Sequence, residues 1–254
     1  MKKIAIYGKG GIGKSTTTAN VAAAMAKSGL RVVQVGCDPK ADSTLLHGAP
    51  QSETVLELLR AGRDVPLDQI VREGRDGVFC VECGGPIPGT GCAGRGIVTA
   101  FDYLREKDME RVYRPDVILY DVLGDVVCGG FTMPMRAGYA DKVFIITSGE
   151  NMAIHAAANI AMAVENFRDR GYAQLGGLIL NRRDVRDERA KVEELASDVH
   201  TRIVGELSRS NTVQEAEALG KTVMEAFPQS EMAGEYRRLA SAVMAACGQE
   251  VALC

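Results

Sequence analysis

The sequence has no excess of basic residues, no apolar run long enough to cross a membrane, and no internal repeat or low-complexity segment. Its 30 Lys and Arg residues face 33 Asp and Glu residues, giving a net charge of -3, which does not support a nucleic-acid-binding or membrane-binding surface. Met1 leads directly into an apolar run, so no targeting segment is visible. We therefore expect a cytoplasmic protein that binds neither nucleic acid nor membrane.

The seven cysteines are odd in number and have no secretory signal beside them, so they do not indicate disulfides. In a reducing compartment, cysteines are more often buried thiols, metal ligands or redox groups. Their positions in the sequence therefore carry more information than their count.

Short apolar runs alternate with longer helical patterns along the chain. The runs expected to form strands are 4–7, 31–35, 117–121, 143–147, 177–180 and 202–207. The patterns expected to form helices include 15–28, 96–107, 151–169, 187–198 and 230–246. Near-continuous apolar strands alternating with helices predict an α/β fold with a doubly wound, mostly parallel sheet. No linker divides the chain, so we expect residues 1–254 to form one domain.

The segment 8–15 reads GKGGIGKS and matches the phosphate-binding loop G-x-x-x-x-G-K-[ST] between a strand and a helix. The glycines let backbone N–H groups turn toward phosphate oxygens, Lys14 can reach the β- and γ-phosphates, and Ser15 can bind Mg²⁺. This pattern predicts a MgATP site in a P-loop NTPase. The residues expected to bind the nucleotide here are Gly8, Lys9, Gly10, Gly11, Ile12, Gly13, Lys14, Ser15 and Thr16.

Acidic clusters follow two of the predicted strands, where ligands bind in open α/β sheets. One cluster, CDPKADS, contains Asp38, Lys40 and Asp42 beside the expected nucleotide, and the other, DVLGD, contains Asp121 and Asp125. Asp121 is expected to hold Mg²⁺ through water. Asp38 and Asp125 are expected to position the attacking water, because phosphoryl transfer depends mainly on orientation and electrostatics.

Cys92 and Cys128 both lie among glycines, which let backbone N–H groups approach the sulfurs of an iron–sulfur cluster. Two thiolates per chain predict a [4Fe-4S] cluster shared across a symmetric dimer. The spacing alone equally allows a single-chain site that also uses Cys80 and Cys83, in a C-x-x-C pattern. Buried or incidental thiols are expected at Cys37, Cys247 and Cys254.

Four segments, YGKGGIGKSTTT, GCDPKADST, GGPIPGTGCAGRG and YDVLGDVVCGGF, are similar to the nitrogenase iron protein family, the ATP-dependent reductase components of nitrogenase and its relatives. The similarity extends over almost the whole chain. It implies a homodimer with two ATP sites and one bridging [4Fe-4S] cluster, bound by Cys92 and Cys128. The partners implied are a heteromeric, nitrogenase-like catalytic component and a small electron donor such as ferredoxin or flavodoxin.

The same resemblance assigns further residues. The loop K-G-G-x-G-K-S resembles that of the deviant Walker A ATPases, which implies that Lys9 contacts the nucleotide of the other subunit. Asn181, Arg209 and Glu217 match nucleoside-site positions. Arg95 matches an arginine on the face that docks the catalytic partner and that is ADP-ribosylated in some members.

The sequence also departs from the nitrogen-fixing members of the family. Cys83 stands where they usually have serine, Met232 where many have glutamine, and Ser208-Arg209-Ser210 where Pro-Arg-Asp is common. The chain also ends before their usual C-terminal extension. These departures favour a nitrogenase-like relative over a dinitrogenase reductase. Among such relatives we expect the methylthio-alkane reductase type, with a dinitrogenase reductase or a nickel-tetrapyrrole reductive cyclase component as the alternatives. A partitioning or positioning ATPase is the alternative from another class.

Overall fold

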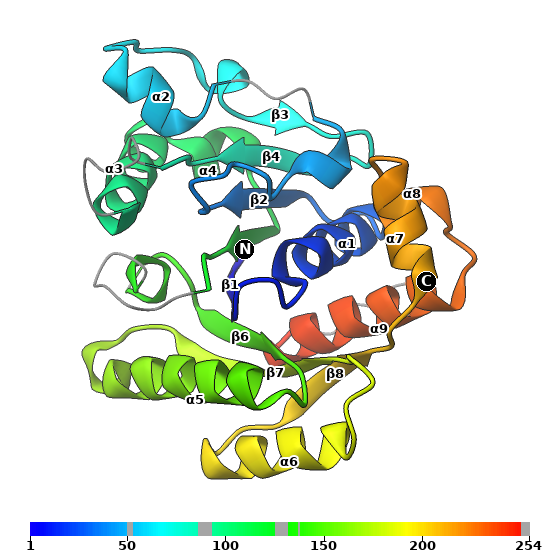
Figure 1. The fold of residues 1–254 in the computed structure, drawn as a ribbon. Helices are drawn as coiled ribbons and strands as arrows, with labels where there is room; N and C mark the ends of the chain where they lie inside the picture. The colour runs from blue at the N-terminus through cyan, green and yellow to red at the C-terminus, as the bar shows by residue number, and fades with distance from the viewer. Residues whose placement is uncertain (50–52, 86–92, 125–131, 137, 250–254) are drawn as a thin grey trace.

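The computed structural model describes residues 1–49, 53–85, 93–124, 132–136 and 138–249, without the side chains of residues 93–95 and 169. Its centre is an eight-stranded sheet in the order β3-β4-β2-β5-β1-β6-β7-β8 (Figure 1). The strands are β1 (Lys2–Gly8), β2 (Val32–Gly36), β3 (Arg72–Glu73), β4 (Phe79–Glu82), β5 (Val117–Asp121), β6 (Lys142–Thr147), β7 (Gln174–Asn181) and β8 (Ile203–Leu207). Neighbouring strands are parallel except for β3 and β4.

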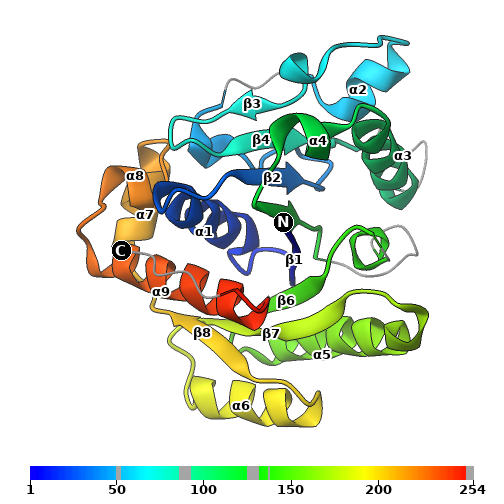
Figure 2. The ribbon, with the colours of Figure 1, turned by 180° about the vertical axis from the view of Figure 1, so that it is seen from behind.

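Helices cover both faces of this sheet (Figures 1 and 2). They are α1 (Lys14–Lys27), α2 (Val55–Arg60), α3 (Ala93–Glu106), α4 (Met109–Tyr113), α5 (Asn151–Asn166), α6 (Glu188–Asp198), α7 (Asn211–Ala218), α8 (Val223–Ala226) and α9 (Glu231–Ala246). One apolar core lies beneath α3, α5 and α6, and a second lies beneath α1 and α9. The small side chains of α1, which reads ANVAAAM at its centre, let this helix pack closely against the sheet and against α9, which lies beside it on the same face (Figure 2).

The central strands have the composition that this arrangement requires. Every residue of β2 and of β5 is buried, as expected for parallel strands covered on both faces. In register, Ile6 of β1 lies beside Asp121 of β5, and Gly36 of β2 lies on the other side of Asp121. The carboxyl ends of three strands therefore meet at one edge, next to the loop that follows β1.

The predicted fold class is confirmed, and each predicted strand and helix is present. The helix predicted at 151–169 is shorter: α5 ends at Asn166, because a 3₁₀ turn at Arg168–Arg170 and the left-handed Gly171 (φ 71°) follow it. The sequence interpretation missed β3, β4, α2, α4, α7 and α8. Among the residues that the structure describes, no helix has the length and apolar character of a membrane span.

Candidate functional site

The loop between β1 and α1 has the conformation of a phosphate-binding loop. Gly13, just before Lys14 begins α1, has a left-handed backbone with φ of 91°, which favours glycine. A Cβ atom at this position would lie 2.6 Å from Nδ2 of Asn181, so a side chain would also collide with β7. Glycine at position 13 therefore lets the loop turn into the helix while Asn181 lies against it.

Lys14 and Asp121 form a buried ion pair at the start of this helix. Lys14 Nζ lies 2.5 Å from Asp121 Oδ1, and the two residues are 8% and 0% exposed. Asp121 Oδ2 is buried and has no hydrogen-bond partner among the residues that the structure describes. An unpartnered carboxylate oxygen at the helix N-terminus fits the outer shell of a Mg²⁺ ion, which commonly keeps several of its waters. Ser15 directly follows Lys14 in the first turn of α1 and is half-buried, so its hydroxyl could bind the same Mg²⁺ ion.

The residues after β5 pack directly on the phosphate loop. A Cβ atom on Gly124 would lie 2.1 Å from Gly8 O and 2.9 Å from Gly10 N. Only a glycine allows the two backbones to approach this closely. Asp125, the next residue, lies outside the described residues, so its expected position beside the γ-phosphate stays a prediction.

The segment 38–44 follows β2 at the same edge. Cys37 N donates to Asp121 O (3.0 Å), which joins the start of the segment to β5. Asp38 accepts the Lys40 N–H at its side chain (2.9 Å), which forms a tight turn. Lys40 and Asp42 are exposed. The structure thus places the three predicted residues of this segment on a turn at the carboxyl edge of the sheet.

Lys9 lies within the phosphate loop, whereas the predicted nucleoside residues Asn181 and Glu217 contact the loop and α1 from other elements. Lys9 is half-buried, and its carbonyl accepts the N–H of Ile12 within the loop (3.1 Å). Asn181 Nδ2 donates to Ile12 O (2.7 Å), and Thr16 Oγ1 donates to Glu217 Oε1 (2.7 Å). Asn181 thus contacts the phosphate loop, and Glu217 contacts the first turn of α1.

Arg209 is placed less directly. Its guanidinium lies 3.8 Å from the carboxylate of Asp184, in an exposed ion pair beyond the end of β7. Among the described contacts, none joins Arg209 to the phosphate loop.

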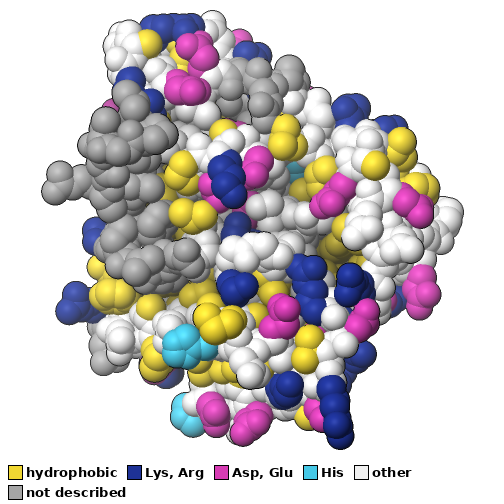
Figure 3. Space-filling view, in the orientation of Figure 1, with side chains coloured by type: hydrophobic (Ala, Val, Ile, Leu, Met, Phe, Trp, Pro, Cys, Tyr) yellow, Lys and Arg dark blue, Asp and Glu magenta, His cyan; other side chains and the backbone are white. Residues whose placement is uncertain are grey.

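The arginine-rich stretch after β7 contributes one residue that the sequence interpretation missed. Figure 3 shows basic and acidic side chains close together on the surface near α6, and the contacts there include the pairing of Arg182 and Arg189 with Glu206. Arg183, in contrast, donates to Gly11 O (2.8 Å) and so places a guanidinium over the phosphate loop. The position of Arg183 two residues after Asn181 was the available signal.

Glu82, at the end of β4, is a second missed residue. Its Oε1 accepts hydrogen bonds from the backbone and side chain of Thr44, whereas its Oε2 is buried and has no partner in the described part of the chain. Burial raises the pKa of Glu82 to about 7, with Asp121 and Asp42 adding to the rise and the Thr44 hydrogen bonds opposing it. A titratable carboxyl group thus stands beside the phosphate site.

The cluster ligands predicted from the sequence, Cys92 and Cys128, lie outside the described residues. Arg95 lies in the first turn of α3, but its side chain is not described. These three assignments stay predictions.

The C-x-x-C alternative can be assessed, because Cys80 and Cys83 are both described and buried. Cys80 packs into the core beneath α1, whereas Cys83 packs into the opposite core, beside Cys37. Burial and a hydrogen bond with Cys83 raise the pKa of Cys37 well above its ordinary value. Thiols on opposite faces of a sheet cannot bind one ion, so the single-chain site with both of these cysteines is wrong. Cys37 and Cys247 are buried thiols, as predicted.

The sequence model of the 4Fe-4S iron sulfur cluster binding proteins, NifH/frxC family, matches residues 2–251. The chain belongs to this family. Nitrogenase iron protein 2 of Methanothermobacter thermautotrophicus is 50% identical over 242 residues, which cover 94% of this chain and 88% of that protein. The expected resemblance to nitrogenase iron proteins is confirmed.

Solved structures with low sequence identity to this chain share its fold. The cell division protein MinD of Aquifex aeolicus superposes with a TM-score of 0.74 at 20% identity, covering 100% of both chains. MinD of Pyrococcus horikoshii, solved with Mg-ADP, gives a TM-score of 0.74 at 21% identity, covering 98% of both chains. At this identity the likeness shows the P-loop α/β fold alone.

Proposed function

We propose that the chain is the ATP-hydrolysing reductase component of a nitrogenase-like system, acting as a homodimer with one bridging [4Fe-4S] cluster. The observation that carries this proposal is the family match over residues 2–251, on a chain whose phosphate loop lies against a buried Lys14–Asp121 pair. The 50% identical relative, named as a nitrogenase iron protein, supports the same assignment.

In the proposed mechanism, Lys14 exchanges one anionic partner for another. Without nucleotide its ammonium group neutralises Asp121; when ATP binds, the ammonium turns to the β- and γ-phosphates and frees Asp121 for the water shell of Mg²⁺. Ser15 supplies a hydroxyl to the same ion. Asp38 orients the attacking water, and Lys9 reaches the nucleotide of the other subunit when the dimer closes.

The contact of Gly124 with the phosphate loop supports a coupling between hydrolysis and the cluster. A change in the loop around the γ-phosphate acts directly on Gly124, and Asp125 and Cys128 follow it by one and four residues. Such a displacement belongs to the nucleotide-driven switches. Cys92 and Cys128 of both chains would hold the cluster, which supplies one-electron transfer chemistry.

For the catalytic partner, we propose a nitrogenase-like component of the methylthio-alkane reductase type, docked at the face that carries Arg95, with a ferredoxin or flavodoxin as donor. Two residues near the expected nucleoside site support this choice, because Ser208 and Met232 differ from the residues usual in nitrogen-fixing members of the family. Ser208 binds Glu235 through its backbone N–H (2.7 Å) and hydroxyl (2.8 Å), and Met232 is buried in the core beneath α9. These substitutions remove the usual proline and glutamine without breaking the local packing.

Iron analysis and ATP hydrolysis of the purified, anaerobic dimer test the proposal. We expect about four iron atoms per dimer and hydrolysis stimulated by a nitrogenase-like partner. A colourless protein without iron would overturn the reductase assignment in favour of a partitioning or positioning ATPase. Reduction of dinitrogen with a dinitrogenase component would instead overturn the choice of partner.

A further inference from the structure

The segment 38–44 is exposed in its middle and anchored at its end. Lys40 and Asp42 are exposed, whereas Ser43 and Thr44 are only 2% and 5% exposed. The turn that carries the proposed catalytic carboxylate therefore depends on what holds these two buried residues.

Glu82 holds Thr44 from the edge of the sheet. Its Oε1 accepts the Thr44 N–H (2.8 Å) and the Thr44 hydroxyl (2.7 Å). Glu82 is in register with Gly36 of β2, where a Cβ atom would lie 2.0 Å from Glu82 Oε2. The missing side chain at position 36 thus makes room for the carboxyl group under the segment.

Gly36 is also in register with Asp121 on its other side. In-register residues of neighbouring strands point to the same face, so Glu82 and Asp121 flank Gly36 on the face covered by α1. Each carboxyl group keeps one buried oxygen that has no partner among the described residues. The carboxyl group of Glu82, which holds Thr44, is therefore separated by the single strand β2 from the carboxyl group of Asp121, which is expected to organise Mg²⁺.

Gln34 holds Ser43 in the same way, two residues earlier on β2. Its Nε2 donates to both the carbonyl and the hydroxyl oxygen of Ser43, each at 2.9 Å, while its Oε1 lies 3.0 Å from His47 Nε2. His47 Nδ1 lies 2.7 Å from Asp76 Oδ2. The donor Nε2 of Gln34 faces a carbonyl, which fixes the amide orientation and makes His47 Nε2 the donor to Oε1. Gln34 and His47 are fully buried.

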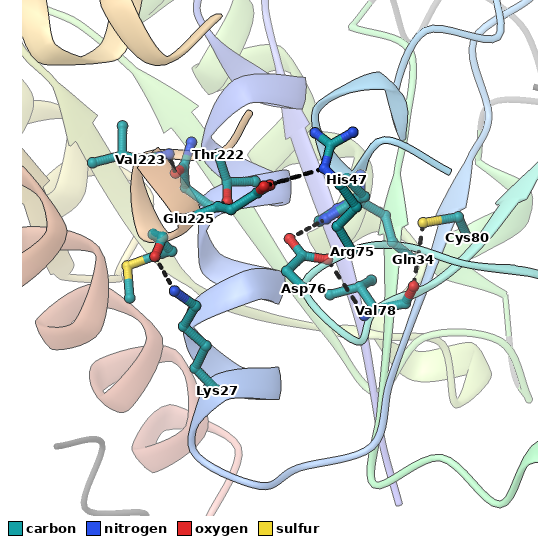
Figure 4. A network of polar contacts seen from close by, with 12 residues as sticks. Lys27, Gln34, His47, Arg75, Asp76, Val78, Cys80, Thr222, Val223 and Glu225 are labelled. Carbon is teal, nitrogen blue, oxygen red and sulfur yellow. Dashed lines mark hydrogen bonds and ion pairs between the residues drawn. The ribbon is translucent and has the colours of Figure 1, made fainter. Parts of the chain in front are cut away.

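This chain of side chains continues to the nucleoside side of the molecule. Figure 4 shows Asp76 directed at His47, and Arg75 reaching from the neighbouring position to Glu225. Arg75 also donates to Gly220 O (2.6 Å), between α7 and α8. Hydrogen bonds thus link Ser43 through Gln34 and His47 to Asp76, whose sequence neighbour Arg75 binds Glu225 and Gly220.

We propose that Glu82 and Gln34 are positioning residues for ATP hydrolysis, which bind Thr44 and Ser43 and thereby set the geometry of the segment 38–44 at the phosphate site. The proposal rests on the proposed function, because the reaction it serves is hydrolysis. Phosphoryl transfer depends on orientation, so a small displacement of this segment should slow the chemical step more than it weakens nucleotide binding.

Substitutions at Glu82 in the holo dimer test this, with kcat and KM of ATP hydrolysis as the first measurement. Glu82→Ala should lower kcat about tenfold or more while KM stays within about twofold. Glu82→Gln should keep kcat within about fivefold, because a carboxamide oxygen still accepts both Thr44 hydrogen bonds. The matched control is Glu57→Ala in α2, whose carboxylate likewise accepts the N–H and hydroxyl of a threonine, Thr54; this variant should leave kcat unchanged.

Hydrogen exchange of the nucleotide-free protein gives a second measurement that needs no activity. Amides of the segment 38–44 should exchange faster in Glu82→Ala and Gln34→Leu than in wild type, and not in Glu57→Ala. Wild-type kcat in Glu82→Ala, an equal loss in Glu82→Gln, or unchanged exchange would each overturn the proposal. If the wild-type dimer hydrolyses no ATP, the proposed function fails, and the exchange comparison still decides whether the segment is held.

Discussion

Removing the Lys14 side chain should destabilise the nucleotide-free protein severely. Asp121 is fully buried, with Oδ1 2.5 Å from Lys14 Nζ, and its Oδ2 has no partner within the described ranges. In Lys14→Ala a buried carboxylate therefore stays behind with no cation. Breaking a buried ion pair by removing one partner costs about 3–5 kcal/mol. For a chain of this size, such a loss corresponds to a decrease in Tm of roughly 10 °C.

Lys3 of β1 provides the control, because its side chain is likewise paired with a carboxylate. Lys3 Nζ lies 2.6 Å from Glu110 Oε1, but these side chains are 15% and 44% exposed. An ion pair open to water contributes about 1 kcal/mol or less, so Lys3→Ala should lower Tm by only a few degrees.

The assay is thermal unfolding of the anaerobic, nucleotide-free dimer, followed by circular dichroism. The double variant Lys14→Met/Asp121→Leu removes both charges and should recover most of the stability, because apolar replacement of a buried pair is often neutral. If Lys14→Ala loses no more stability than Lys3→Ala, the Lys14–Asp121 pair does not hold the empty site together. The mechanism would then lose the partner exchange of Lys14.

Four further predictions follow from the same site. The pKa of Glu82 is raised to about 7 from an ordinary 4.5, so the folded state holds a proton that the unfolded state releases. The free energy of unfolding of the wild type should therefore fall as pH rises from 4.5 through 7, by up to about 3 kcal/mol, and Glu82→Gln should remove this pH dependence. Urea unfolding at several pH values checks this. Lys9→Ala should fold and bind nucleotide weakly yet fail in ATP-driven electron transfer, and partner reduction at the wild-type rate would contradict its role across the dimer. In the wild type, MgATP should speed the removal of cluster iron by a chelator, and in Asp125→Glu this effect of MgATP on the chelation rate should be altered. Chelation rates equal to those of the wild type, with and without MgATP, would refute the switch. Cys92→Ser should abolish the cluster and Cys83→Ser should spare it, as measured by iron per dimer.

The sequence was informative wherever a function is encoded in consecutive residues. The motif at 8–15, between an apolar strand and an alanine-rich helix, predicts a phosphate-binding loop. The rule that ligands bind at the carboxyl ends of strands predicts that Asp121 lies beside this loop. By contrast, β4 is only four residues long and ends in a charged residue, so its sequence pattern does not predict a strand. Without that strand, Cys80 and Cys83 read as a metal-binding pair; strand geometry places them on opposite faces.

The roles of Glu82 and Arg183 depend on strand order, which local patterns do not reveal. Glu82 meets Thr44 only because β4 lies beside β2, and Arg183 reaches Gly11 only because β7 lies close to β1 in the sheet. A glutamate and an arginine in such positions look like ordinary surface charges in the sequence. Burial and an unpartnered carboxylate oxygen distinguish Glu82, and both are properties of the assembled sheet.

The sheet order also has a consequence for how the protein is made. β1, which leads into the phosphate loop, pairs with β5 and β6, so its neighbours begin only at residues 117 and 142. At about 5–20 residues per second, the ribosome leaves this apolar strand without partners for roughly 5–25 s. An unpaired apolar strand is prone to aggregate, so the nascent chain should depend on chaperones during this interval. The phosphate loop can therefore gain both neighbouring strands of β1 only after residue 147 has emerged.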